Sequence, residues 1–130
     1  MENKNIYKIL SILILIVIFI ASLCLAIREK RIAIIGAMDV EINEILENLD
    51  NKHSKQISDF KITTGNLGKY KIILSKSGIG KVCAATTTQF IIDHYKPSYI
   101  INIGMAGGLS PDLKAGDVVI GEKQYNMILT

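Results

Sequence analysis

Two short apolar runs that both stop at small residues constrain the fold of this chain more than any other feature. Residues 32–36 (IAIIG) are followed by Ala-Met-Asp-Val-Glu, and residues 100–104 (IINIG) are followed by Met-Ala-Gly-Gly-Leu. Such runs are typical of buried parallel strands, and ligands in open α/β sheets collect beyond the carboxyl ends of these strands. Three glycines lie within residues 104–108, where peptide N–H groups without a neighbouring Cβ can approach a bound molecule. We therefore predict a small-molecule site at the carboxyl ends of these two strands, with Glu41 as the acidic residue beside it.

The rest of the chain predicts an α/β layer fold with a mixed sheet. A helix should begin near Asp39, which could cap it, and its apolar positions fall on one face. Residues 51–54 are polar and are interpreted as a turn, and residues 65–68 as the turn of a hairpin. The expected order is β-α-β-β-α-β-β, with two crossover helices. The strands are predicted at 31–35, 60–64, 70–75, 99–103 and 117–120, and the helices from 39 and over 80–95.

The predicted domain ends soon after its last strand, without a helix to cover the sheet edge. Native domains usually cover or blunt such an edge. We therefore expect residues 31–130 to form the N-terminal part of a domain that is incomplete at its C-terminus.

An uncharged stretch near the N-terminus is expected to lie outside this domain. Residues 9–27 are nineteen consecutive uncharged residues, which as a helix would span about 28 Å, close to the ~30 Å core of a bilayer. The absence of a polar face argues against a buried core helix. Small residues at positions 24 and 26 also fit a cleaved signal peptide. We therefore assign residues 1–30 to a signal peptide or transmembrane anchor and predict a membrane-anchored or exported protein, with its orientation open.

The distribution of charge argues against a nucleic-acid-binding domain. Residues 1–31 hold five of the fifteen Lys and Arg and two of the twelve Asp and Glu, which accounts for the whole net charge of +3. The remaining ten cations and ten anions leave residues 32–130 neutral. Binding to nucleic acid needs clustered cations against phosphate, so no such partner is expected.

Neither the cysteines nor the histidines predict a metal site. Cys24 lies in the apolar stretch and Cys83 in a predicted helix, so we do not expect a disulfide, and neither has the spacing of a zinc site. His53 and His94 are isolated and are interpreted as residues of a surface loop and a helix face. We therefore predict no metal ion and no cofactor.

Two local motifs remain ambiguous when each is taken alone. The stretch SGIGKV at residues 77–82 lacks the first glycine and the Ser or Thr of a phosphate-binding loop, so it fits a tight strand-to-helix turn or a ligand-lining loop. Glu41 lies in the first turn of a predicted helix, where the helix dipole favours a carboxylate in any protein. The combination of both junctions is what favours a site.

Four stretches in order resemble one enzyme family. They are IAIIGAMDVEI (32–42), SGIGKVCAA (77–85), KPSYIINIGMAGGL (96–109) and KAGDVVI (114–120). Together they resemble the bacterial 5′-methylthioadenosine/S-adenosylhomocysteine nucleosidases over residues 31 to about 125. The resemblance implies a three-layer α/β/α fold shared with nucleoside phosphorylases and a homodimer at full length. It also implies hydrolysis of the N-glycosidic bond of methylthioadenosine or S-adenosylhomocysteine, releasing adenine.

The resemblance also implies roles for individual residues. Glu41 matches the glutamate that acts as general base on the attacking water, and Met38 matches a methionine against the ribose. Gly107 falls at a substrate-binding glycine, and Ala37 and Ile79 match residues that line the pocket. These roles are physically consistent, because an oxocarbenium-like transition state needs a carboxylate near water and sugar.

Two departures from the family pattern bear on function. Met105 stands where the family usually has serine, so a bulky thioether replaces a hydroxyl beside Ala106, and both residues are included in the predicted substrate-binding set. The family's aspartate that protonates the purine lies in its C-terminal half, and residues 110–130 contain no counterpart. Loss of a general acid alone costs about 10²–10⁴ in rate, so we expect the 130-residue chain to be inactive by itself.

Two other functions stay open at this point. A nucleoside phosphorylase of the same fold would need a phosphate site of arginine and serine, yet the only arginine of the domain is Arg31 at its start. A non-catalytic envelope protein that binds a partner or an anionic polymer would fit the N-terminal segment, but the neutral domain argues against it.

Overall fold

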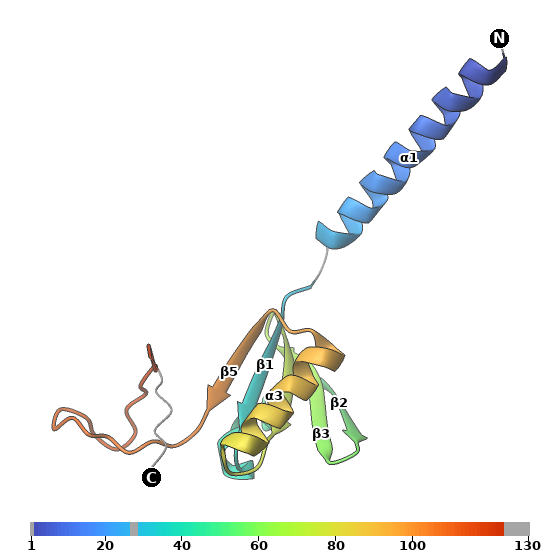
Figure 1. Ribbon diagram of the computed structural model, residues 1–130. Coiled ribbons are helices and arrows are strands. Elements are labelled where there is room, and N and C mark those ends of the chain that lie inside the picture. Colours follow the sequence, from blue (N-terminus) through green and yellow to red (C-terminus); the bar gives the residue numbers. More distant parts are fainter. Residues whose placement is uncertain (1, 27–28, 124–130) are drawn as a thin grey trace.

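The computed structural model describes residues 2–26 and 29–123 of the chain, and Figure 1 shows a small α/β body preceded by one long helix. Side chains in that first helix are described for residues 7–8 and 10–22. The elements are α1 (Glu2–Ala26), β1 (Arg31–Gly36), α2 (Asp39–Glu47), β2 (Asp50–Ile57), β3 (Phe60–Leu67), β4 (Tyr70–Lys76), α3 (Lys81–Tyr95) and β5 (Tyr99–Ile103).

The strands form one mixed sheet, as the sequence predicts, and their order in it is β2-β3-β4-β1-β5. β1 lies in the interior of the sheet and pairs in parallel with β4 and β5. β2, β3 and β4 form an antiparallel meander on one side. The two parallel pairings place the carboxyl ends of β4, β1 and β5 at the same edge of the sheet.

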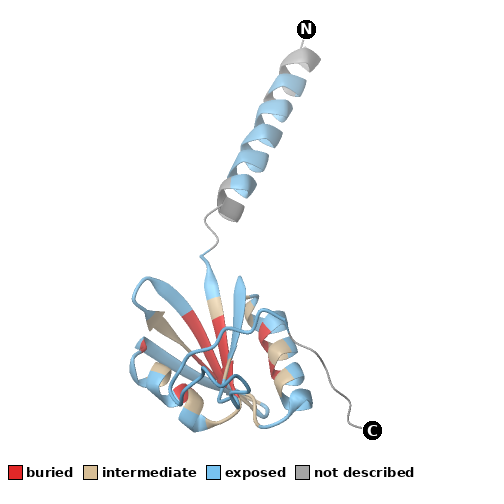
Figure 2. Ribbon diagram, turned by 90° about the vertical axis from the view of Figure 1, so that its left-hand side faces the viewer, coloured by how far each residue is buried: buried red, intermediate tan, exposed pale blue. Residues whose placement is uncertain are grey.

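One helix packs on each face of the sheet, which gives the three predicted layers. Ala33 and Ile35 of β1 are buried together with Ile91 of α3. Ile34, on the opposite face of the strand, is buried with Ile42 of α2. β1 is apolar at successive positions because both of its faces are covered. Figure 2 shows that the buried residues lie along the central strands and on the helices beside them.

The structure corrects two parts of the predicted hairpin region. Residues 51–54, interpreted as a turn, belong to the edge strand β2, which pairs with β3 in antiparallel fashion. Its residues are almost all exposed, so the strand has no apolar alternation for a sequence pattern to reveal. Gly65 lies inside β3, not in the turn. A Cβ there would lie 2.9 Å from the Asp50 carbonyl oxygen and 3.1 Å from the Leu49 Cβ, so the close approach of this chain segment favours glycine. The turn is at Gly68, whose φ is +58°.

The strand predicted at 117–120 is absent from the described structure. Residues 104–123 have no helix or strand, and Val118 and Ile120 are exposed. A strand is held by its pairing, and within the described residues this segment pairs with no strand of the sheet. The observed order of the body is therefore β-α-β-β-β-α-β.

The helix expected near the N-terminus is present as α1, and the side chains described in its middle are exposed. Among the residues that the structure describes, no helix has both the length and the apolarity needed to cross a membrane. The side chains of residues 24–26, on which the cleavage-site interpretation rests, lie outside those described.

Candidate functional site at the carboxyl edge of β1 and β5

The fold brings the two glycine-containing junctions together. β1 and β5 are neighbours in the sheet, and Gly36 at the end of β1 is the register partner of Ile103 at the end of β5. The segments that follow, residues 37–41 and 104–108, therefore leave the sheet at adjacent positions. This agrees with the predicted convergence of the two junctions.

The carboxylate of Glu41 connects the two junctions directly. Its Oε2 accepts hydrogen bonds from the N–H groups of Ala37 at 2.7 Å and Met38 at 2.9 Å. Its Oε1 accepts a third hydrogen bond from the Met105 N–H at 3.3 Å, across 64 residues of sequence. One side chain in the first turn of α2 thus satisfies backbone donors from both loops.

Asp39 has a different role from the predicted helix cap. Met38 holds the N-cap position, with extended backbone angles, and Glu41 accepts the N–H of that residue. The Asp39 carboxylate instead pairs with the Lys76 ammonium at the end of β4, with 2.7 Å between Oδ2 and Nζ. Both side chains are about half exposed or more, so this ion pair connects α2 to the sheet edge at the surface.

Two glycines allow the close approach of the helix and the loops. A Cβ at Gly36 would lie 2.6 Å from Cγ2 of Ile42 and 3.3 Å from Cβ of Glu41. A Cβ at Gly104 would lie 3.1 Å from Oε1 of Glu41. Sequence reasoning treated these glycines as strand ends and missed this second requirement. A sequence signal was available, because Gly36 ends β1 and Gly104 directly follows β5.

The hydrogen bonds to Glu41 set its ionisation. The Met38 N–H contributes most to holding the pKa of the Glu41 carboxyl below its ordinary value of 4.5. The Met105 and Ala37 N–H groups act in the same direction, whereas partial desolvation acts against them. Hydrogen bonds to a carboxylate favour its charged form. Glu41 is therefore an anion at neutral pH, and it keeps hydrogen-bonding capacity, because a carboxylate offers about four acceptor positions.

A third loop lies at the same edge. The Ser77 N–H donates to the Gly36 carbonyl at 2.9 Å and so extends the pairing of β4 with β1 beyond the end of β4. Ile79 in this loop is 77% exposed and therefore available to a ligand. Gly78 and Gly80 both have positive φ angles, so the turn geometry favours glycine at these positions. The structural interpretation of SGIGKV, a tight turn between strand and helix, holds.

The remaining predicted site residues, Met105, Ala106 and Gly107, follow β5 at the same edge. Met105 presents a side chain that is 76% exposed, and Ala106 beside it is also exposed. A Cβ at Gly107 would meet no heavy atom within 4 Å, so the backbone there is open to a ligand. Within the described residues, no group of three or more His, Cys, Asp or Glu side chains could hold a metal ion.

Comparison with known proteins identifies the family. The B. subtilis strain 168 5′-methylthioadenosine/S-adenosylhomocysteine nucleosidase is 47% identical over 90 residues, which are 69% of this chain and 39% of that protein. A nucleosidase structure from Colwellia psychrerythraea with adenine matches with 36% identity and a TM-score of 0.66, covering 69% of this chain and 37% of that one. The Neisseria meningitidis nucleosidase with methylthio-immucillin-A gives 41% identity and a TM-score of 0.65, covering 68% and 38%.

The chain thus spans about two fifths of the length of these relatives. Residues 31–130 also match the family model of the phosphorylase superfamily. The chain therefore belongs to the phosphorylase superfamily.

Proposed function

We propose that this chain carries the water-activating part of a 5′-methylthioadenosine/S-adenosylhomocysteine nucleosidase site. The reaction is hydrolysis of the N-glycosidic bond with release of adenine. The observation that carries the proposal is the Glu41 carboxylate, which is held by backbone N–H groups from both glycine-containing junctions. Similarity to nucleosidases whose structures contain adenine or methylthio-immucillin-A supports the substrate class.

In this proposal Glu41 acts as the general base. Its three N–H partners keep the carboxylate ionised and fix its orientation, leaving one acceptor position of about four for a water molecule. As the glycosidic bond breaks, the ribosyl group gains oxocarbenium character. The carboxylate then removes a proton from the water that attacks the anomeric carbon, and adenine leaves after it has been protonated elsewhere in the site.

The surrounding residues are proposed to bind the substrate. Ala37 and Met38 are half-buried beside the carboxylate. In this proposal the Met38 side chain contacts the ribose, as the family resemblance implies. The open backbone at Gly107 and the exposed side chains of Ile79 and Met105 provide apolar contacts and N–H donors for a purine and a thioether. Ala106 completes this loop. The family resemblance assigns the acid that protonates the purine to a part beyond the matched stretch, so we propose that residues 31–130 need that part for turnover.

A chimera tests the proposal without assuming that the chain acts alone. Residues 31–120 would replace the matching segment of the B. subtilis relative, and adenine release from methylthioadenosine would be measured by chromatography. We expect the chimera to release adenine and Glu41→Gln to reduce the rate by about 10²–10⁴, the usual contribution of a general base. Glu44→Gln is the matched control, because Glu44 is an exposed carboxylate one turn further along α2.

The same assay separates the competing functions. A nucleoside phosphorylase would require inorganic phosphate and form a ribose phosphate, whereas a hydrolase would work equally well without phosphate. A folded chimera without adenine release, or with equal release in Glu41→Gln, would refute the proposed role and favour a binding protein.

Association with a membrane and formation of a homodimer remain predictions. The uncharged run at residues 9–27 motivates the first, and the family resemblance motivates the second. Separation of the expressed chain into membrane and soluble fractions, with and without residues 1–30, tests the location. Sedimentation of the folded chimera tests the dimer.

A further inference from the structure

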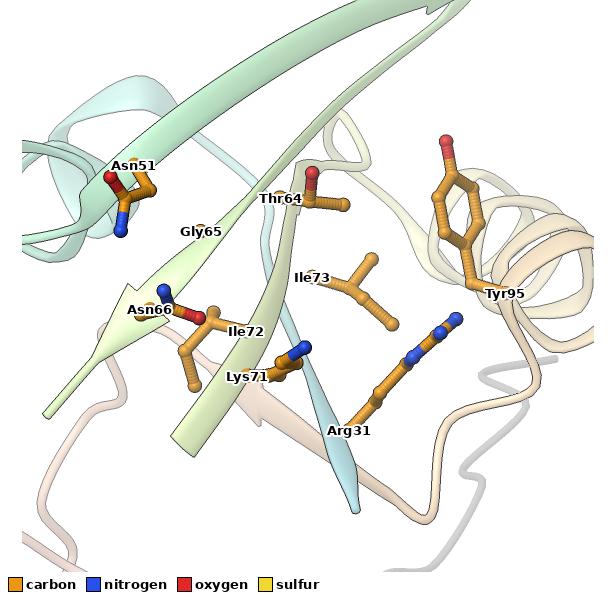
Figure 3. Close-up of a pocket in the computed structure, with 9 residues that line it drawn as sticks. All are labelled: Arg31, Asn51, Thr64, Gly65, Asn66, Lys71, Ile72, Ile73 and Tyr95. Carbon is orange, nitrogen blue, oxygen red and sulfur yellow. The ribbon is translucent and has the colours of Figure 1, made fainter. Parts of the chain in front are cut away.

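A pocket lies at the opposite end of the sheet from Glu41. It has a volume of about 320 Å³ and includes Arg31, the first residue of β1, and Lys71, near the start of β4. Figure 3 shows Arg31, Lys71 and Tyr95 around the same space, contributed by two strands and the end of α3. The cavity is thus at the amino ends of the parallel strands, whereas Glu41 follows the carboxyl end of β1.

The two cations of this cavity are placed where they repel each other. Arg31 and Lys71 are register partners in the parallel pair β1–β4, so their side chains leave the same face of the sheet. Like charges at directly opposed positions destabilise a sheet. Lys71 has a partner in Glu29, with Nζ 2.5 Å from Oε2, and both side chains are about half exposed. Within the described residues no ion pair is formed by Arg31, and no carboxylate lines the cavity.

The remaining lining suits an anion that carries oxygen acceptors. The amide of Asn66 can donate hydrogen bonds, and Ile73 provides a buried apolar wall. The ring of Tyr95 borders the pocket, and its hydroxyl points away from Arg31 and Lys71 (Figure 3). The carboxyl end of α3 adds about half a negative charge nearby. Two full positive charges outweigh that half charge, and the balance stays positive even when Glu29 is counted.

We propose that this cavity binds the phosphate group of a small ligand. The planar guanidinium of Arg31 matches two phosphate oxygens in a bidentate arrangement, and Lys71 contributes a point charge when the anion replaces Glu29. The group would belong either to a soluble phosphate compound or to the headgroup of an anionic lipid. The lipid source is consistent with the predicted membrane association of residues 9–27. These residues lie in α1, which precedes β1 (Figure 1), and the pocket includes Arg31 at the start of β1.

The first experiment measures binding of inorganic phosphate to the full chain. Amide chemical shifts would be followed while phosphate replaces chloride at constant ionic strength. We expect saturable shifts at Arg31 and Asn66, and a dissociation constant raised about tenfold or more in Arg31→Gln, because charged hydrogen bonds are the strong ones. Lys55→Gln is the control, since Lys55 is an exposed lysine of β2 that does not line the cavity.

The second experiment uses vesicles of phosphatidylglycerol mixed with phosphatidylcholine, and vesicles of phosphatidylcholine alone. A greater loss of binding to the anionic vesicles in Arg31→Gln than in Lys55→Gln would support a lipid headgroup as the source. Saturable binding of free phosphate with the same variant pattern would support a soluble compound. The proposal fails if neither probe binds, or if the two variants weaken binding equally, as diffuse surface charge would. Adenine release is not used in either experiment, so this result is independent of the proposed function.

Discussion

A single added methyl group at Gly36 should disturb both the core and the candidate site. In Gly36→Ala the new Cβ would lie 2.6 Å from Cγ2 of Ile42, about 1 Å closer than the 3.5–4.0 Å at which carbon atoms pack. Ile42 is buried and β-branched, so in a helix its Cγ2 has little rotational freedom. Relief therefore requires a shift of α2 away from β1. Overpacking of this kind costs about 1–3 kcal/mol.

The shift of α2 would also move Glu41, whose bond to the Met105 N–H is already 3.3 Å long. We expect this bond to break in Gly36→Ala, since a longer separation is no longer a hydrogen bond. Urea denaturation followed by circular dichroism measures the stability change, and hydrogen exchange at the Met105 amide reports the bond.

Two further variants make this prediction refutable. Gly107→Ala is the matched control, because a Cβ there would meet no heavy atom within 4 Å, and its stability should change by less than about 0.5 kcal/mol. Ile42→Leu removes the Cγ2 atom, so adding it to Gly36→Ala should recover part of the lost stability as a favourable coupling energy. The reasoning is wrong if Gly36→Ala is as stable as the unmodified chain, or if the double variant shows no coupling.

Three other predictions concern the same edge. In Glu41→Gln the stability lost relative to the unmodified chain should be largest at neutral pH and should shrink as the pH falls below 4.5, because a pKa that is lowered in the folded state stabilises only the ionised carboxylate. Urea denaturation at several pH values measures this loss, and a loss that stays constant with pH would contradict the prediction. Gly104→Ala should change stability by less than about 1 kcal/mol and should speed hydrogen exchange at the Met105 amide, because the flexible Glu41 carboxylate would move away from a Cβ that would lie 3.1 Å from it. Unchanged hydrogen exchange at this amide would argue against the contact. Lys76→Met should lower the free energy of unfolding by less than about 1 kcal/mol in low salt and by still less in high salt, because the ion pair with Asp39 is exposed. A larger loss of stability that does not depend on salt would contradict this prediction.

Local sequence patterns were sufficient to predict an element wherever its buried positions show as a regular pattern of apolar residues. The runs that form β1 and β5 are apolar at successive positions, and α2 places Ile42 and Ile45 on one face, so these elements were predicted within a residue or two. β2 was not predicted, because its side chains are almost all exposed and show no apolar pattern. Its place in the sheet comes from backbone pairing with β3. The prediction of a strand at 117–120 was wrong for the converse reason. Its apolar residues have no partner strand among those described.

The sequence by itself determined that two buried strands end in small residues, that Glu41 follows one of them in the first turn of a helix, and that the family motif continues at the other. It indicated that the two junctions share a site, but it did not determine the strand order and register that bring them together. Only the tertiary structure places β5 beside β1 with Gly36 opposite Ile103, which brings the Met105 N–H to Glu41 across 64 residues. The physical reason is that hydrogen bonds within a turn follow from local spacing, whereas contacts between distant segments depend on strand order and register, which the whole core decides.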